Sequence, residues 1–363
     1  MRIPPKGGTS PVGSSRAEPE AAPPSANENP VQVQRYDGQL TRQTGAAALV
    51  EPVQRPRAAL PCLPIEIWRH IAGYLDEGKA EDLAGALWIR ELVGATKLIR
   101  TNAGVGDDAA RIIAEDLAIK EADLRGNKIT DLGAEALAQS TSLISLRLGG
   151  NSRIRGGGVV DFSSNTTLRL LDLANLNIED PVAAALGHNP NLRELNLSGN
   201  KLMDWGVRAL IARSQVTSLN LSDNSFGTIA ALALADSRRI QTLDISGNSA
   251  DDPDEVDGAI GLGMLGFGIA DLGAVMDRFA QNTTIKSLGL DRLGLQDDHV
   301  RRLLRNTSIN SLSVRGNKIT DVGVMALLAE PRITSLDLRG NPISDNAKAA
   351  LEAARDRFKK LDF

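Results

Sequence analysis

The stretch Leu192–Asn200, which reads LRELNLSGN, decides the fold. It has the form L-x-x-L-x-L-x-x-N, and its centre alternates polar and apolar residues as a half-buried strand does. The same nine-residue form returns as LISLRLGGN at 143–151 and as ITSLDLRGN at 333–341. The chain is therefore predicted to consist of many similar units, each with one short strand.

The ninth position of this pattern recurs every 24 or 25 residues, apart from one interval of 45. The residues at this position are Asn127, Asn151, Leu176, Asn200, Asn224, Asn248, Leu293, Asn317 and Asn341. This signature and period indicate leucine-rich repeats. We predict an α/β leucine-rich-repeat solenoid of about nine 24-residue repeats. Strands should line its concave side and short helices its convex side.

The asparagine at the ninth position lies inside the coil, where it can hydrogen-bond the backbone of neighbouring turns. The side chain of leucine has no amide group and cannot make these hydrogen bonds. The turns at Leu176 and Leu293 are therefore expected to be looser than the others.

An aspartate recurs four residues after the ninth position, where a helix N-cap is expected. These aspartates are Asp131, Asp180, Asp204, Asp297, Asp321 and Asp345. Small and apolar residues follow, as in GAEALA at 133–138. Their spacing predicts a short helix with Ala136 and Leu137 on its inner face.

The array is expected to begin with a degenerate turn at 95–103 and to end with a strand that buries Phe358, Leu361 and Phe363. We expect no catalytic domain after that strand. One repeat carries about twenty extra residues near 249–268. Insertions in a solenoid become loops, so a surface loop is predicted there.

Two further segments precede the array, which spans 95–363. Residues 1–59 are rich in Pro, Ser, Ala, Gln and Glu, and are predicted to be disordered. Residues 60–94 are predicted to form a small helical module that begins with LPIEIWRHIAGYL at 63–75. Its apolar residues cover about half of a helix, whereas a single packing contact needs about 100°. A second helix at 81–93 would cover one side and leave the other for a partner.

This module resembles the opening of an F-box, which reads Leu-Pro-x-Glu-apolar and ends in Tyr-Leu. The matching residues are Leu63, Pro64, Glu66, Ile67, Ile71, Tyr74 and Leu75. The resemblance implies that the helix docks on the Skp-family adaptor of a Skp–cullin–F-box ubiquitin ligase while the repeats select a target. The implied adaptor-binding residues are Leu63, Pro64, Glu66, Ile67, Ile71 and Leu75.

The array with its GAEALA signature is similar to the GALA-type F-box effectors of plant-pathogenic bacteria. The N-terminal segment resembles a type III secretion signal. Together these resemblances imply a virulence protein that is injected into a host cell and acts in the host cytoplasm or nucleus. In the alternative interpretation, the apolar helix only caps the first turn of a non-enzymatic protein-binding scaffold. A GTPase-activating repeat protein is a third possibility.

Composition argues against other classes. The net charge of the 363 residues is −4, which predicts neither nucleic acid nor a membrane as a partner. Cys62 is the single cysteine, so no internal disulfide can form. The GLGMLG stretch at 261–266 lacks the strand and helix of a dinucleotide site and is interpreted as loop. No metal spacing or catalytic triad is evident, so we expect no metal, cofactor or enzymatic activity.

The predicted concave face is mostly small and polar and holds few residues typical of binding hot spots. A merely solvated face is one interpretation. If the face binds a target, its charged residues are the candidates for contacting a charged partner surface. These are Asp123, Arg125, Arg147, Asp172, Asp244, Arg315, Asp337 and Arg339.

Overall fold

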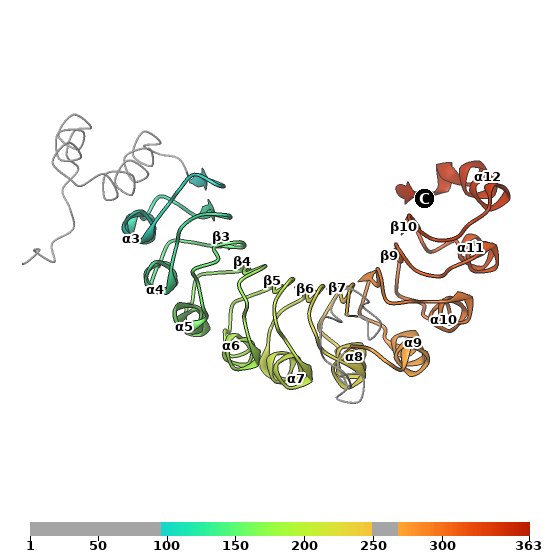
Figure 1. Cartoon of the computed structure of the whole chain (residues 1–363), viewed down its shortest axis with the longest axis horizontal. Coiled ribbons are helices and arrows are strands. Elements are labelled where there is room, and N and C mark those ends of the chain that lie inside the picture. Colours follow the sequence, from blue (N-terminus) through green and yellow to red (C-terminus); the bar gives the residue numbers. More distant parts are fainter. Residues whose placement is uncertain (1–95, 249–267) are drawn as a thin grey trace, which may run out of the picture. The chain divides into compact units, whose positions relative to one another are not determined.

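The computed structural model describes residues 96–248 and 268–363. Within this repeat array, the strands lie along one face and the helices along the other, as predicted (Figure 1). The predicted disordered segment, the helical module with Cys62 and the 249–267 part of the insertion lie outside the described residues.

The strands form one parallel sheet of eleven strands in sequence order. They are β1 (Lys97–Ile99), β2 (Glu121–Asp123), β3 (Ser145–Arg147), β4 (Leu170–Asp172), β5 (Glu194–Asn196), β6 (Ser218–Asn220), β7 (Thr242–Asp244), β8 (Ser287–Gly289), β9 (Ser311–Ser313), β10 (Ser335–Asp337) and β11 (Lys360–Asp362). The middle residues of neighbouring strands are paired throughout, so their leucines form one buried column that Ala122 interrupts. The leucine-rich-repeat fold is thereby confirmed.

A helical segment follows each strand from β1 to β10. These are α3 (Asp107–Glu115), α4 (Asp131–Ala138), α5 (Gly157–Val160), η1 (Asp161–Ser163), α6 (Asp180–Leu186), α7 (Asp204–Arg213), α8 (Thr228–Ala235), α9 (Leu272–Gln281), α10 (Asp297–Leu303), α11 (Asp321–Leu328), α12 (Asp345–Ala353) and η4 (Arg355–Arg357). Helix α5 has only four residues because its glycines disfavour helix. In the described part of the chain, no helix has the length and apolarity to cross a bilayer.

The core lies between the sheet and the helices and is built largely of aliphatic side chains. Leu143, Leu146 and Leu148 are fully buried, as the pattern predicts. In α4, Leu137 is buried as predicted, but the alanines buried beside it are Ala134 and Ala138 rather than the predicted Ala136. The helix turns about 100° per residue, which brings i and i+3 to one face. The inner face is therefore rotated from the predicted one.

The final predicted strand is present as β11. Leu361 is buried and continues the central column, whereas the flanking phenylalanines are half-buried. Arg355 and Arg357 lie over the rings of Phe363 and Phe358, at 5.4 and 4.4 Å from the ring centres. These cation–π contacts cover aromatic surface at the end of the described array.

The asparagines at the ninth position join consecutive coils, as predicted. Asn151 donates through Nδ2 to the carbonyls of Leu148, 2.6 Å away in its own coil, and Leu124, 2.9 Å away in the coil before. Its Oδ1 accepts the N–H of Ile129 at 3.1 Å. One buried amide thus satisfies backbone groups that the three-residue strands leave unpaired.

The turns without this asparagine are not looser, so that prediction was wrong. Oδ1 of Asn200, in the next coil, accepts the N–H of Leu176 at 3.1 Å and that of Ile178 at 2.9 Å. Asn177, between them, has a positive φ of 55°. The turn at Leu293 receives the same two bonds from its following coil. The next coil's asparagine therefore closes these turns.

The recurring aspartates are the first residues of their helices, one position beyond the predicted N-cap. Except at Asp345, their carboxylates cap the helix of the following coil instead. Oδ1 of Asp297, in α10, accepts the N–H groups of Thr320 and Gly323 at 2.8 and 3.0 Å. Oδ2 accepts the Thr320 hydroxyl at 2.6 Å. Carboxylates that accept the corresponding backbone N–H groups belong to Asp107, Asp131, Asp180, Asp204 and Asp321.

This capping explains the glycine two residues after the aspartate in the repeated D-x-G sequences. A Cβ at Gly323 would lie 2.5 Å from Oδ1 of Asp297, and one at Gly206 would lie 2.3 Å from Oδ1 of Asp180. Any side chain there would displace the carboxylate of the preceding coil.

A second asparagine row, which the repeat pattern did not predict, lies where four of the helical segments return to the next strand. Asn165 donates through Nδ2 to the carbonyls of Ala138 and Ser140, at 2.7 and 3.0 Å. Its Oδ1 accepts the N–H of Leu168 at 2.8 Å. Asn189, Asn282 and Asn306 do the same in their coils.

Replacing Asp297 by alanine should lower the free energy of unfolding by about 1–2 kcal/mol, because two N–H groups and a hydroxyl lose their acceptor. Asp345→Ala is the matched control. Asp345 starts α12, its side chain is 98% exposed, and it accepts no backbone N–H among the described residues. That control should lose less than about 0.5 kcal/mol in urea unfolding. Equal losses would contradict capping across coils.

Candidate functional site

Two adjoining depressions cross the strand face of the sheet. The first, of about 350 Å³, extends from Arg147 on β3 to Asp244 on β7. The second, of about 220 Å³, extends from Thr242 on β7 to Lys360 on β11. Both are lined by Thr242 and Asp244, so they adjoin at β7, and we name the two together the strand-face trough.

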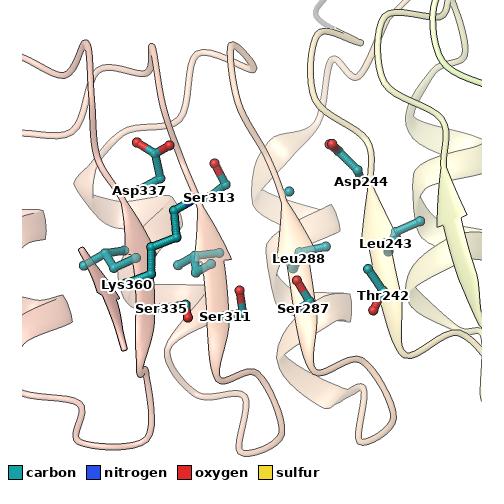
Figure 2. Close-up of a pocket in the computed structure, with 13 residues that line it drawn as sticks. Thr242, Leu243, Asp244, Ser287, Leu288, Ser311, Ser313, Ser335, Asp337 and Lys360 are labelled. Carbon is teal, nitrogen blue, oxygen red and sulfur yellow. The ribbon is translucent and has the colours of Figure 1, made fainter. Parts of the chain in front are cut away.

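Short side chains line the second half of the trough. Ser287, Ser311 and Ser335 lie side by side on consecutive strands, between Thr242 and Lys360 (Figure 2). Serine side chains leave room for another chain to approach the sheet closely, and their hydroxyls can donate or accept hydrogen bonds. This half therefore combines open space above the sheet with a row of hydroxyls.

Acidic side chains dominate the first half of the trough. Asp172, Glu194 and Asp244 line it, and Arg147 is the single basic residue of that lining. Asn196 and Asn220 add carboxamides between them. A cation would therefore meet a favourable field there.

The aspartates of the strand face also close turns. Oδ1 of Asp172 accepts the N–H of Ala174, two residues on, at 3.1 Å. Asn196 and Asn220 make the same bond in the next two coils, at 3.0 and 2.9 Å. An uncharged carboxamide at this position thus closes the turn as well as a carboxylate does.

Two predicted arginines are held by aspartates of their own strands. Nε and Nη2 of Arg125 contact the two carboxylate oxygens of Asp123 at 2.9 and 2.7 Å, and Arg339 makes the same two-pronged contact with Asp337. The hydrogen bond from Arg125 lowers the pKa of Asp123 below its usual value. Burial opposes ionisation of Asp337, but bonds from Arg339 still lower its pKa.

The structure brings together only part of the predicted site. Arg147, Asp172, Asp244 and Asp337 line the trough. The residues that do not line it are Asp123, Arg125, Arg315 and Arg339. Glu194 and Lys360 do line it and were not predicted. Both are the first residue of their strand, as Ser145 is of β3. Side chains alternate between the two faces of a strand, so this position could have been predicted to face outward.

The implied adaptor-binding residues Leu63, Pro64, Glu66, Ile67, Ile71 and Leu75 all lie outside the described residues. In the described part of the chain, no three or more His, Cys, Asp or Glu side chains are grouped so as to hold a metal ion.

Comparison with known proteins agrees with this architecture. A family model, Leucine Rich repeat, matches residues 120–138, 188–210, 305–328 and 332–347. With the parallel sheet, these matches define the class: the chain folds as a leucine-rich-repeat protein. The search of curated proteins found no match.

Solved structures provide two likenesses of fold. One is an internalin (inlF) of Listeria monocytogenes, at 18% identity and a TM-score of 0.41, with 70% of each chain covered. The other is a leucine-rich-repeat protein of Leptospira interrogans, at 20% identity and a TM-score of 0.43. That match covers 70% of this chain and 57% of the Leptospira chain.

Burial raises the pKa of Asp172 above its usual value, despite the nearby charges of Arg125 and Arg147. The folded chain therefore retains this proton to higher pH than the unfolded chain does. Ionisation of Asp172 then lowers the free energy of unfolding as the pH rises through the folded pKa.

Asp172→Asn should consequently be more stable than the parent at pH 7, because it removes a buried charge and keeps an acceptor for the N–H of Ala174. The difference should shrink as the pH falls through the pKa of Asp172 and the parent carboxylate protonates. Urea unfolding of both proteins at pH 7 and pH 4 measures this. A variant less stable than the parent at pH 7 would contradict the assignment of a costly buried charge.

Proposed function

We propose that this protein is a binding scaffold that takes a partner protein on the strand-face trough. The observation that supports this best is the trough itself, two adjoining depressions across the sheet, one of which is lined by short polar side chains. The array acts by holding a partner rather than by catalysis.

The character of the trough favours a polypeptide over a small molecule. Small-molecule sites are concave, largely apolar and able to surround their ligand. This trough instead crosses strands from β3 to β11, and carboxylates, carboxamides and hydroxyls line it beside the leucines of the strands. A protein partner supplies many separate polar contacts along such a length.

Ser311→Trp should abolish partner capture, because an indole would fill the middle of the serine row. Arg301→Trp is the matched control, since Arg301 is exposed on α10, on the helix side of the array. Proteins captured from host extract by the parent and by the control, and lost with Ser311→Trp, would be trough partners. Capture that survives in Ser311→Trp and fails in Arg301→Trp would place the binding surface on the helices.

We further propose that the scaffold is an F-box-like substrate receptor. The support comes from the sequence, in the Leu63-Pro64-x-Glu66 start and the wide apolar arc of 63–75. In this proposal, that helix docks on a host Skp-family adaptor and the trough holds the target. The ligase chemistry belongs to the partners, and the N-terminal segment directs type III secretion into the host cytoplasm or nucleus.

A pull-down with a purified plant Skp-family adaptor tests this second proposal. The full chain should bind the adaptor, and Leu63→Ala/Pro64→Ala should not, because the start of the docking helix is removed. Circular dichroism should show both proteins equally folded. If neither protein binds, the helix is a solenoid cap and the scaffold function remains without a link to ubiquitin.

A further inference from the structure

Five of the described strands end in an aspartate, and three of these aspartates have a side-chain partner two residues on. Arg125 pairs with Asp123, and Arg339 pairs with Asp337. The hydroxyl of Ser246 donates to Asp244 at 2.5 Å. Asp362, at the end of β11, lies 3.6 Å from Nζ of Lys360. Asp172 is followed at the two-residue spacing by Ala174, which has no polar side chain.

Asp172 is nevertheless the most buried of these groups. Only 8% of the residue is exposed, and it lines the first half of the trough. One carboxylate oxygen accepts the N–H of Ala174, and the other has no hydrogen-bond partner among the described residues. Ionisation of a carboxylate in such a position is costly, and a counter-charge that reaches the carboxylate lowers that cost.

The negative charge is not needed for the fold. Asn196 and Asn220 close the same turn in the two following coils without any charge. The charges of Arg125 and Arg147 act on Asp172, but neither arginine makes a hydrogen bond or ion pair with it. Arg125 is held by Asp123, and Arg147 contacts the hydroxyl of Ser145 at 3.4 Å. The open oxygen of Asp172 is thus available to a group from outside the chain.

We propose that the partner held in the trough inserts an arginine side chain that pairs with Asp172, supplying the guanidinium that Arg125 and Arg339 supply to their aspartates. This inference rests on the proposed binding function. The other two carboxylates of this half, Glu194 and Asp244, favour the same cation. A guanidinium fits because its planar fork gives a carboxylate two parallel hydrogen bonds.

The first test titrates the isotope-labelled full chain with the tripeptide acetyl-Gly-Arg-Gly-amide and follows the Ala174 amide by NMR. A saturable shift is expected, because pairing at Asp172 perturbs the bond to that amide. The same peptide with citrulline is the control, since citrulline has nearly the shape of arginine without its charge. Asp172→Asn should bind the arginine peptide at least about tenfold more weakly. An equal response to both peptides, or from Asp172→Asn, would overturn the proposal.

The second test supplies the missing arginine within the chain. Ala174→Arg recreates the spacing of the Asp123–Arg125 pair, so it should raise the melting temperature and block the arginine peptide. Ala174→Gln, which is long but uncharged, should do neither. If Ala174→Arg leaves peptide binding intact, Asp172 is not the receiving group.

The arginine contact at Asp172 and the use of the trough for binding can be refuted separately. A trough partner, defined by its loss in Ser311→Trp, that binds Asp172→Asn as tightly as the parent would refute the arginine contact and leave the scaffold function standing. Host proteins that bind equally to the parent and to Ser311→Trp would refute the trough as the binding surface itself.

Discussion

The structure depends on side-chain amides and carboxylates that satisfy the backbone of neighbouring coils. Each strand has only three residues, so backbone pairing ends almost as soon as it begins. Asn151 bonds carbonyls of two coils and accepts an N–H from the earlier one, and Asp297 does the equivalent for the start of the next helix. Without such groups, buried N–H and C=O groups would lose their partners at every turn. Each such group must meet its counterpart one coil away, and it does so even across the coil with the 45-residue interval, where Asn282 bonds the carbonyl of Ala235.

These contacts constrain the surface as well as the interior. The aspartates and asparagines that end the strands close turns, so the polar column of the strand face is partly a structural device. Coils that end a strand in aspartate differ in the residue two positions after that aspartate. Arg125 and Arg339 neutralise their aspartates, whereas Ala174 leaves Asp172 open toward the trough. A regular scaffold thereby carries an irregular pattern of charge, and that pattern is where recognition of a partner can reside.

The sequence anticipated the repeats better than the contacts between them. The leucine spacing located the strands, and the apolar residues after each aspartate located the helices. The aspartates were predicted to be N-caps but are the first helical residues, because local capping rules consider a single helix. Their real acceptor role lies across coils, at Thr320 for Asp297 for example. The turns at Leu176 and Leu293 were misjudged for the same reason, because their hydrogen bonds come from the following coil.

The sequence by itself determined the solenoid, the alternation that separates core from strand face, and the set of charged residues on that face. These follow from periodicity, which reports which side of a strand or helix a residue occupies. Only the tertiary structure decided which charges are already paired and which remain open. Pairing depends on where coils bring side chains together in space, and the burial that makes Asp172 costly to ionise exists only once the neighbouring coils are stacked.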